Sequence, residues 1–137
     1  MNKYYLFVIK KRNINIYKNK SYVLYKNLEK LYYLKAYDFS YGLNIYNTLC
    51  DYISVKLLNN YINSRIKHRR INNIIEIDKR NYITIKRSCI IMYTNNKRNI
   101  LFKIFNIYND NIFVCDFKNN NYFWLNDYLK KGKFNHF

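Results

Sequence analysis

The chain has 137 residues, enough for one domain that buries about two-thirds of its unfolded surface. Half of the residues are hydrophobic, which excludes a disordered protein, although 25 Lys and Arg face only 8 Asp and Glu, for a formal net charge of +17. The three cysteines lack a Cys-x-x-Cys pair, which argues against a disulfide framework or zinc ribbon and predicts a reducing compartment.

Asn, Ile, Lys and Tyr supply more than half of the chain, whereas Gly occurs twice and Pro never. The four abundant residues have codons rich in A and T, and the scarce ones have codons rich in G and C. This bias is typical of the genome of a mitochondrion, a plastid, or an AT-biased parasite or endosymbiont. It predicts an organelle-encoded protein of the mitochondrial matrix, with the plastid as the alternative.

The apolar segment 4–9 is followed directly by Lys10-Lys11-Arg12 and has no small-residue cleavage site, so no signal peptide is expected. No stretch is uncharged and apolar over the length of a transmembrane helix, so no membrane span is expected either.

The first third of the chain predicts a strand at 4–9, a basic turn at 10–13, a possible strand at 22–25 and a short helix at 28–34. Together these elements predict an N-terminal extension, residues 1–44, made of a β-hairpin and a short helix.

The clearest predicted helix runs from Ile45 to Lys67, because its apolar residues recur at steps of four and form one stripe. The stripe shifts by one position at Leu57-Leu58. Cations follow in the last turn, where the helix dipole favours them. This helix opens the second predicted unit, an α+β domain over 45–137.

Alternating apolar and polar residues predict a strand over 82–93 with one basic face, followed by a loop at 95–99. Two further strands are predicted at 100–108 and 112–117, joined by a tight hairpin at Asn109-Asp110-Asn111.

A final short helix is predicted over 122–130, and Gly132 is expected to cap its C-terminus. The predicted fold class is therefore α+β. It consists of an amphipathic helix, a small three-stranded antiparallel sheet and a short C-terminal helix, preceded by the N-terminal extension.

Self-repulsion at a net charge of +17 is tolerable mainly when a polyanion neutralises it, and nucleic acid is the leading candidate. An anionic membrane surface or an acidic partner subunit is the alternative. Clustered cations are the expected contacts to RNA backbone phosphates. They are Arg65, Lys67, Arg69, Arg70, Lys86, Arg87, Lys97, Arg98, Lys103, Lys130, Lys131 and Lys133.

Catalytic and metal chemistry are not expected. Glu76 and Asp78 resemble the paired acids of a metal-dependent nuclease strand, but a local ion pair explains them better. His68 and His136 have no carboxylate or Cys at metal-ligand spacing, so neither a metal nor a cofactor is predicted. Most of the 17 tyrosines are expected to be core or ordinary surface aromatics.

Three short motifs, in their order along the chain, resemble the small-subunit ribosomal protein S-nineteen family. Lys86-Arg87-Ser88-Cys89-Ile90 resembles the family strand motif R-R-S-x-I, and Ile107-Tyr108-Asn109-Asp110 resembles the hairpin motif I-Y-N-G. Leu129-Lys130-Lys131-Gly132-Lys133-Phe134 keeps the Lys, Gly and Phe of the ending H-K-L-G-E-F. The chain departs from the family in the missing K-G-P-F segment, two insertions and the absent basic A-P-T-R tail.

The resemblance covers at most residues 50–137 and implies a non-catalytic structural protein of the mitochondrial small ribosomal subunit. It would bind small-subunit rRNA in the subunit head, beside proteins of the S-thirteen and S-fourteen families. Arg87-Ser88-Cys89 with Thr94 resembles the S-fourteen family more weakly. The remaining alternatives are a basic accessory subunit of an organellar membrane complex and, last, an RNA-processing enzyme using Glu76 and Asp78.

Overall fold

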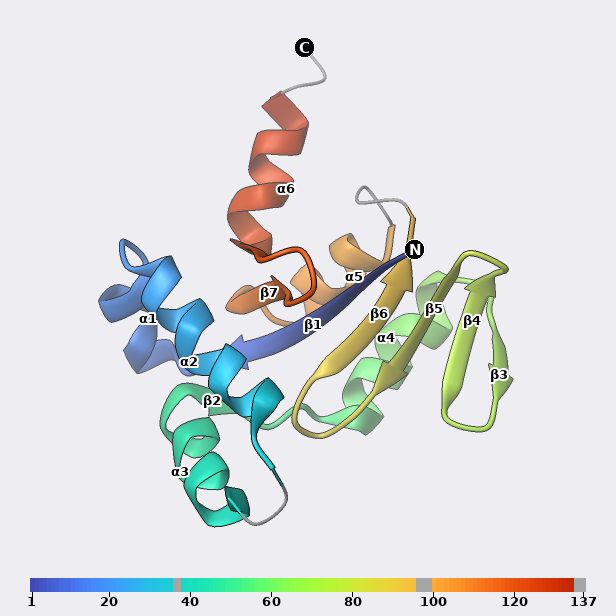
Figure 1. Cartoon of the computed structure of the whole chain (residues 1–137). Helices are drawn as coiled ribbons and strands as arrows, with labels where there is room; N and C mark the ends of the chain where they lie inside the picture. The colour runs from blue at the N-terminus through green and yellow to red at the C-terminus, as the bar shows by residue number, and fades with distance from the viewer. Residues whose placement is uncertain (36–37, 96–99, 135–137) are drawn as a thin grey trace.

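The computed structural model describes residues 1–35, 38–95 and 100–134, and side chains as far as residue 131. Its elements are β1 (Asn2–Ile9), α1 (Lys11–Tyr17), α2 (Ser21–Tyr33), α3 (Phe39–Leu49), β2 (Cys50–Asp51), α4 (Val55–Arg65), β3 (Arg69–Ile71), β4 (Ile74–Asp78), β5 (Asn81–Ile85), β6 (Ile90–Thr94), α5 (Ile100–Tyr108), β7 (Ile112–Asp116), β8 (Asn121–Trp124) and α6 (Leu125–Phe134). The strands form one antiparallel sheet in the order β3-β4-β5-β6-β1-β7-β8, and the short β2 pairs with β1 (Figure 1).

The first strand, β1, lies in the middle of this sheet. Its backbone pairs with β6 on one side and β7 on the other, so that Leu6 lies opposite both Ile90 and Val114. Alternate side chains of β1 enter two different hydrophobic cores. A strand buried on both faces has no solvent-facing side, which is why residues 4–9 are almost continuously apolar.

One core lies between the sheet and helices α4, α5 and α6. Tyr4, Leu6 and Val8 of β1 contribute to it. The helices add fully buried side chains, among them Leu58 of α4 and Phe105 of α5.

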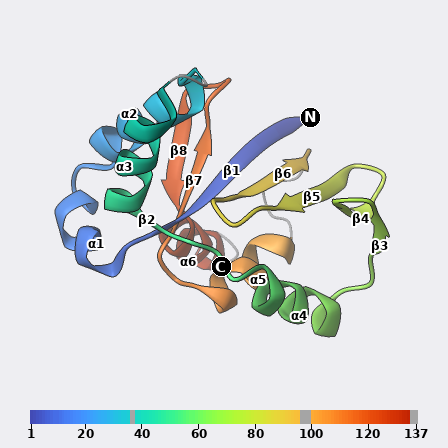
Figure 2. The ribbon, with the colours of Figure 1, turned by 90° about the horizontal axis from the view of Figure 1, so that it is seen from below.

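The second core lies on the opposite face, under α1, α2 and α3 (Figure 2). Phe7 and Ile9 of β1 meet Leu24, Tyr25 and Leu28 of α2 there. The molecule therefore consists of three layers, with the sheet between two groups of helices.

This architecture corrects the predicted fold class. The protein is a sheet-rich α+β fold with eight strands among the described residues, and the predicted three-stranded sheet behind an N-terminal extension is wrong. The prediction failed because β1 is a central strand of the sheet. Its partners β6 and β7 lie far along the chain, and no local pattern in the sequence indicates that they pair with it.

Near the N-terminus, the strand predicted at 4–9 is confirmed as part of β1. The basic turn predicted at 10–13 is wrong, because α1 begins at Lys11. The strand predicted at 22–25 is also wrong: these residues belong to α2, which continues through most of the helix predicted at 28–34. Tyr and Val are common in strands. Here the buried residues of α2 recur at helical spacing, and their burial favours a helix.

The single helix predicted from Ile45 to Lys67 is instead two helices, α3 and α4. The chain extends between them because β2 pairs with the end of β1. Ser54 then caps α4, since its side chain accepts a hydrogen bond from the Leu57 N–H, as is usual at the start of a helix. The shift in the apolar stripe at Leu57-Leu58 lies in the first turn of this second helix.

The strand predicted over 82–93 is two strands, β5 and β6, which a turn at 86–89 folds against each other. The strand predicted at 100–108 is wrong, because these residues form α5. Its buried residues follow helical spacing, and Lys103 lies on the exposed side. The predicted hairpin at 109–111 joins a helix to a strand.

The strand predicted at 112–117 is confirmed as β7. The helix predicted over 122–130 begins later than expected, because its first residues form β8. It also continues through Gly132 to Phe134, so the predicted glycine cap is wrong. Within the described ranges, no helix has the length and apolar character needed to cross a membrane.

The three thiols provide a test of the packing of the second core, to which all three belong. Cys50, Cys89 and Cys115 are all buried, and burial raises the pKa of each thiol above its ordinary value. The native thiolate fraction is therefore lower than in the unfolded chain, and a thiol reagent at about pH 8 should react only as the protein opens. We expect slow labelling that becomes complete in denaturant. Rapid labelling of the native protein would contradict this packing.

Candidate nucleic-acid interface

Helix α4 connects two of the predicted groups of cations. At its start, the Ile53 N–H donates to the Arg87 carbonyl at 2.7 Å, which holds the β5–β6 turn beside the helix. Near its end, the Arg70 Nη2 donates to the Oδ1 atoms of Asn59 and Asn63 at 3.2 and 3.0 Å. The length of this 11-residue helix therefore separates the two groups.

These cations define a surface that we call the α4 basic surface. All of its members are exposed. They are Lys56, Arg65, Lys67, Arg69, Arg70, Lys86 and Arg87.

The core fixes the orientation of α4. Leu58 and Ile62 are fully buried, so the opposite side of the helix faces solvent. That side carries Lys56, Asn60 and Ser64, which are all exposed and polar. At the start of the helix, the Tyr108 hydroxyl of α5 accepts a hydrogen bond from the Ser54 N–H at 2.9 Å and holds this turn in place.

A polar hollow of about 620 Å³ lies at the C-terminal end of α4, lined by residues 63–68. Arg65 is fixed there, with its guanidinium 4.7 Å from the Tyr61 ring centre and its Nη1 3.0 Å from the Ser64 Oγ. His68 Nδ1 lies 3.0 Å from the Ile66 carbonyl, to which it donates a hydrogen bond. The Lys67 side chain is exposed and makes no hydrogen bond or ion pair with another described residue.

Arg69 and Arg70 of this group also have structural partners. Arg69 forms an ion pair with Glu76 across β3 and β4, at 3.3 Å. Arg70 connects β3 to α4 through its two asparagine contacts. The cations predicted at 65–70 thus divide into two sets. Arg65, Arg69 and Arg70 have partners within the protein, whereas Lys67 is free to contact a ligand.

Lys86 and Arg87 lie in the β5–β6 turn, and the expectation that they lie on a strand is wrong. The turn is closed by the Lys86 N–H, which donates to the Cys89 carbonyl at 2.9 Å. The Arg87 guanidinium lies 5.1 Å from the centre of the Tyr52 ring, and this cation–π contact orients it.

The remaining predicted contacts lie elsewhere. Lys103 is exposed on α5, which packs against both α4 and α6. Lys130 and Lys131 are exposed on α6, on the far side of α5 from α4. Lys97 and Arg98 lie outside the described residues, as does the side chain of Lys133.

The two acids considered for nuclease chemistry have local roles. Glu76 pairs with Arg69. Asp78 closes the β4–β5 turn by accepting hydrogen bonds from the Asn81 side chain and the Arg80 N–H, which lower the pKa of its carboxyl. Over the described ranges, no group of three or more His, Cys, Asp or Glu side chains is placed to hold a metal ion.

Sequence reasoning missed two members of this region. Lys56 is absent from the predicted contacts, although it is exposed in the first turn of α4. Tyr52 was not singled out, although it supports Arg87. The sequence carried no local signal for Tyr52, because its position depends on the break between α3 and α4, which the pairing of β2 with β1 produces.

No protein-family model matches the sequence, and no curated protein matches it either. The function proposed below therefore rests on the charge and geometry of the chain itself.

Alanine substitutions should separate structural cations from binding ones. Arg70→Ala removes two hydrogen bonds between β3 and α4, so the free energy of unfolding should fall by about 0.5–1.5 kcal/mol. Lys67→Ala should change it by no more than about 0.5 kcal/mol. Urea denaturation measures both values. Equal effects of the two substitutions would contradict the division.

Proposed function

We propose that this protein is a non-catalytic RNA-binding component of a ribonucleoprotein particle. The small subunit of an organellar ribosome is the first candidate, and the mitochondrial matrix is the first compartment. The observation that carries the proposal is the excess of exposed positive charge. The formal net charge is +17, and most of the described Lys and Arg side chains are exposed.

The few acids do little to neutralise these cations. Two ion pairs form among the described residues, Lys26–Glu29 and Arg69–Glu76. Asp78 and Asp116 instead accept hydrogen bonds in the turns that follow β4 and β7. A protein with so much uncompensated charge gains most from a partner with closely spaced negative charges, as in the RNA backbone.

The spacing of the cations also favours RNA. The α4 basic surface presents charge at both ends of a rigid helix, so several phosphates can be contacted at once. Folded RNA is recognised largely through its backbone and shape, which requires clustered cations rather than a specific set of polar side chains. The three motifs that resemble the S-nineteen family support the small ribosomal subunit as the particle. They support it by sequence alone, because Ile107 and Tyr108 end α5 and do not form a hairpin.

Sedimentation tests the particle assignment. In gradients of organelle lysate, the protein should travel with the small ribosomal subunit and leave that fraction when RNA is digested. If it travelled with respiratory complexes in detergent and left ribosomal particles untouched, the ribosomal assignment would be wrong. In that case an accessory role on a membrane complex would explain the charge.

Salt dependence tests the phosphate contacts directly. The logarithm of the binding constant for structured RNA should fall with the logarithm of salt concentration with a slope steeper than about −3. Lys67→Ala should weaken binding about equally for all sequences and make the slope shallower by about 1. The matched control is Asn60→Ala, an exposed neutral residue of the same helix. A wild-type slope near zero would contradict phosphate binding.

A further inference from the structure

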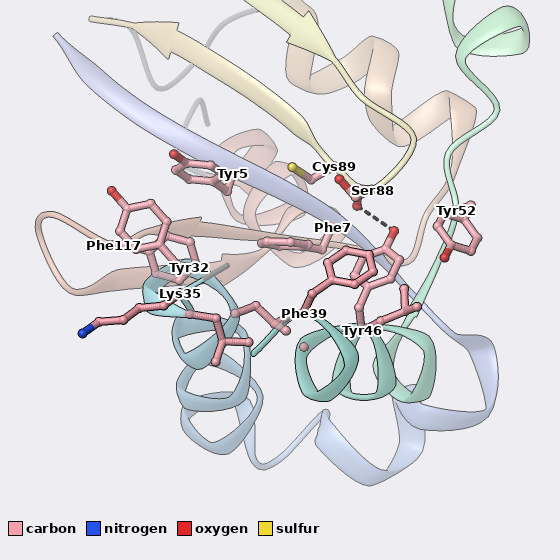
Figure 3. A pocket seen from close by; sticks show the side chains of 14 residues that line it. Tyr5, Phe7, Tyr32, Lys35, Phe39, Tyr46, Tyr52, Ser88, Cys89 and Phe117 are labelled. Carbon is pink, nitrogen blue, oxygen red and sulfur yellow. Dashed lines mark hydrogen bonds between the residues drawn. The ribbon is translucent and has the colours of Figure 1, made fainter. Parts of the chain in front are cut away.

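A second hollow, the aromatic pocket, lies between helices α2 and α3 and the adjacent face of the sheet (Figure 3). Its volume is about 430 Å³, within the range of small-ligand sites. Half of the side chains that line it are aromatic, and they come from separate parts of the fold: Tyr5, Phe7, Tyr32, Phe39, Tyr46, Tyr52 and Phe117.

Three of these rings are exposed to solvent. Phe39 is 70% exposed, Tyr52 is 48% exposed and Tyr32 is 44% exposed. They lie around one pocket and are not scattered over the surface. A contiguous exposed apolar patch of this kind is characteristic of a binding site.

The pocket is rigid on its inner side. The Tyr32 ring stacks on Phe117 with centroids 4.7 Å apart and planes 17° from parallel, and Phe117 stacks on the buried Tyr25 at 5.6 Å. Tyr32 is thus the outermost ring of a stack anchored in the core. Across the pocket, the Tyr46 hydroxyl donates to the Ser88 carbonyl at 2.7 Å, which fixes its ring.

A close helix contact shapes the opposite wall. A Cβ added at Gly42 of α3 would lie 2.6 Å from Leu34 Cδ1, so only glycine lets α3 approach this side chain without displacing it. Both residues line the pocket. Gly42 is one of two glycines in the chain, and no motif drew attention to it.

The charges around the pocket are positive. Lys35 is a lining residue, and its ammonium points away from the hollow toward solvent. On the other side, Arg87 lies over Tyr52 at 5.1 Å. None of the described lining residues carries a carboxylate, and the acids nearest in sequence, Asp38 and Asp51, are not among them. An aromatic hollow with cations on both sides matches a nucleotide, which has a flat base and flanking phosphates.

We propose that the aromatic pocket binds an unstacked base of single-stranded RNA, while Arg87 and Lys35 contact the flanking phosphates. This inference rests on the proposed function and adds a second mode of binding to it. Every base has an aromatic face, and the lining has few polar groups, so the site accepts different bases. Its role is to hold a loop or bulge whose base has left the helix, next to the RNA backbone bound by the α4 basic surface.

The test compares two probes of equal length, an oligouridine RNA of about ten nucleotides and an abasic ribose-phosphate chain. Fluorescence anisotropy measures their affinities for the wild-type protein and for Phe39→Ala. The abasic chain keeps the phosphates and lacks the bases. Phe39→Ala should weaken oligouridine binding by about 5- to 100-fold and leave abasic binding and the salt slope unchanged.

Tyr41→Ala is the matched control, because Tyr41 is an aromatic residue of the same helix, is 55% exposed and does not line the pocket. It should leave both affinities unchanged. A second measurement does not depend on affinity. Photo-crosslinking of 5-iodouridine RNA should attach the base to peptides containing Phe39 or Tyr52, and the Phe39→Ala protein should lose the first product.

The outcomes separate this inference from the proposed function. Equal wild-type affinity for the two probes, or equal effects of Phe39→Ala and Tyr41→Ala, would overturn the base site but leave phosphate binding intact. In that case the pocket would instead bind an apolar side chain from a neighbouring protein. If neither probe bound at low salt, both proposals would fail.

Discussion

The fold depends on one strand that is buried on both faces. β1 pairs with β6 and β7, and its alternate side chains fill the two hydrophobic cores, so the two groups of helices are connected through it. Full burial of each large apolar side chain contributes about 1.5–3 kcal/mol. No position between Tyr4 and Ile9 can therefore become polar without loss to one core or the other. The only half-buried member of this run is Tyr5, whose ring lies at the aromatic pocket.

A segment was predicted correctly where its apolar pattern matches the burial of its faces in the fold. Residues 4–9 and 112–117 are apolar on both sides and form central strands. Residues 100–108 are equally apolar, but a short run rich in Ile and Phe fits a buried strand as well as a short helix. Only the placement of Lys103 on the exposed side separates the two. The break between α3 and α4 depends on the pairing of β2 with β1, a contact between distant segments that no local pattern encodes.

The candidate site was partly predictable for a similar reason. The positions of cations can be read from a sequence, so the groups at 65–70 and 86–87 could be named. The partner that each cation has in the fold could not be read in this way. All four side chains are exposed, but Arg69 and Arg70 use their hydrogen bonds on β4 and α4, whereas Lys67 and Lys86 make no side-chain hydrogen bond or ion pair with another described residue. The aromatic pocket was not predictable, because its rings come from β1, α2, α3 and the segments after β2 and β7. Because tyrosine is frequent in a chain of AT-rich codons, the sequence does not distinguish the few tyrosines that line this pocket.

The position of β1 in the sheet also constrains how the protein folds during synthesis. Its residues leave the ribosome long before those of the strands that flank it, because β6 and β7 begin at Ile90 and Ile112. Pairings so distant in sequence form slowly, because a long loop must close before any contact stabilises it. Until then, an apolar strand with two unpaired edges is exposed, and such a strand is prone to aggregate. Lys10, Lys11 and Arg12 follow the strand directly, and charges in this position oppose the association of exposed apolar strands by mutual repulsion.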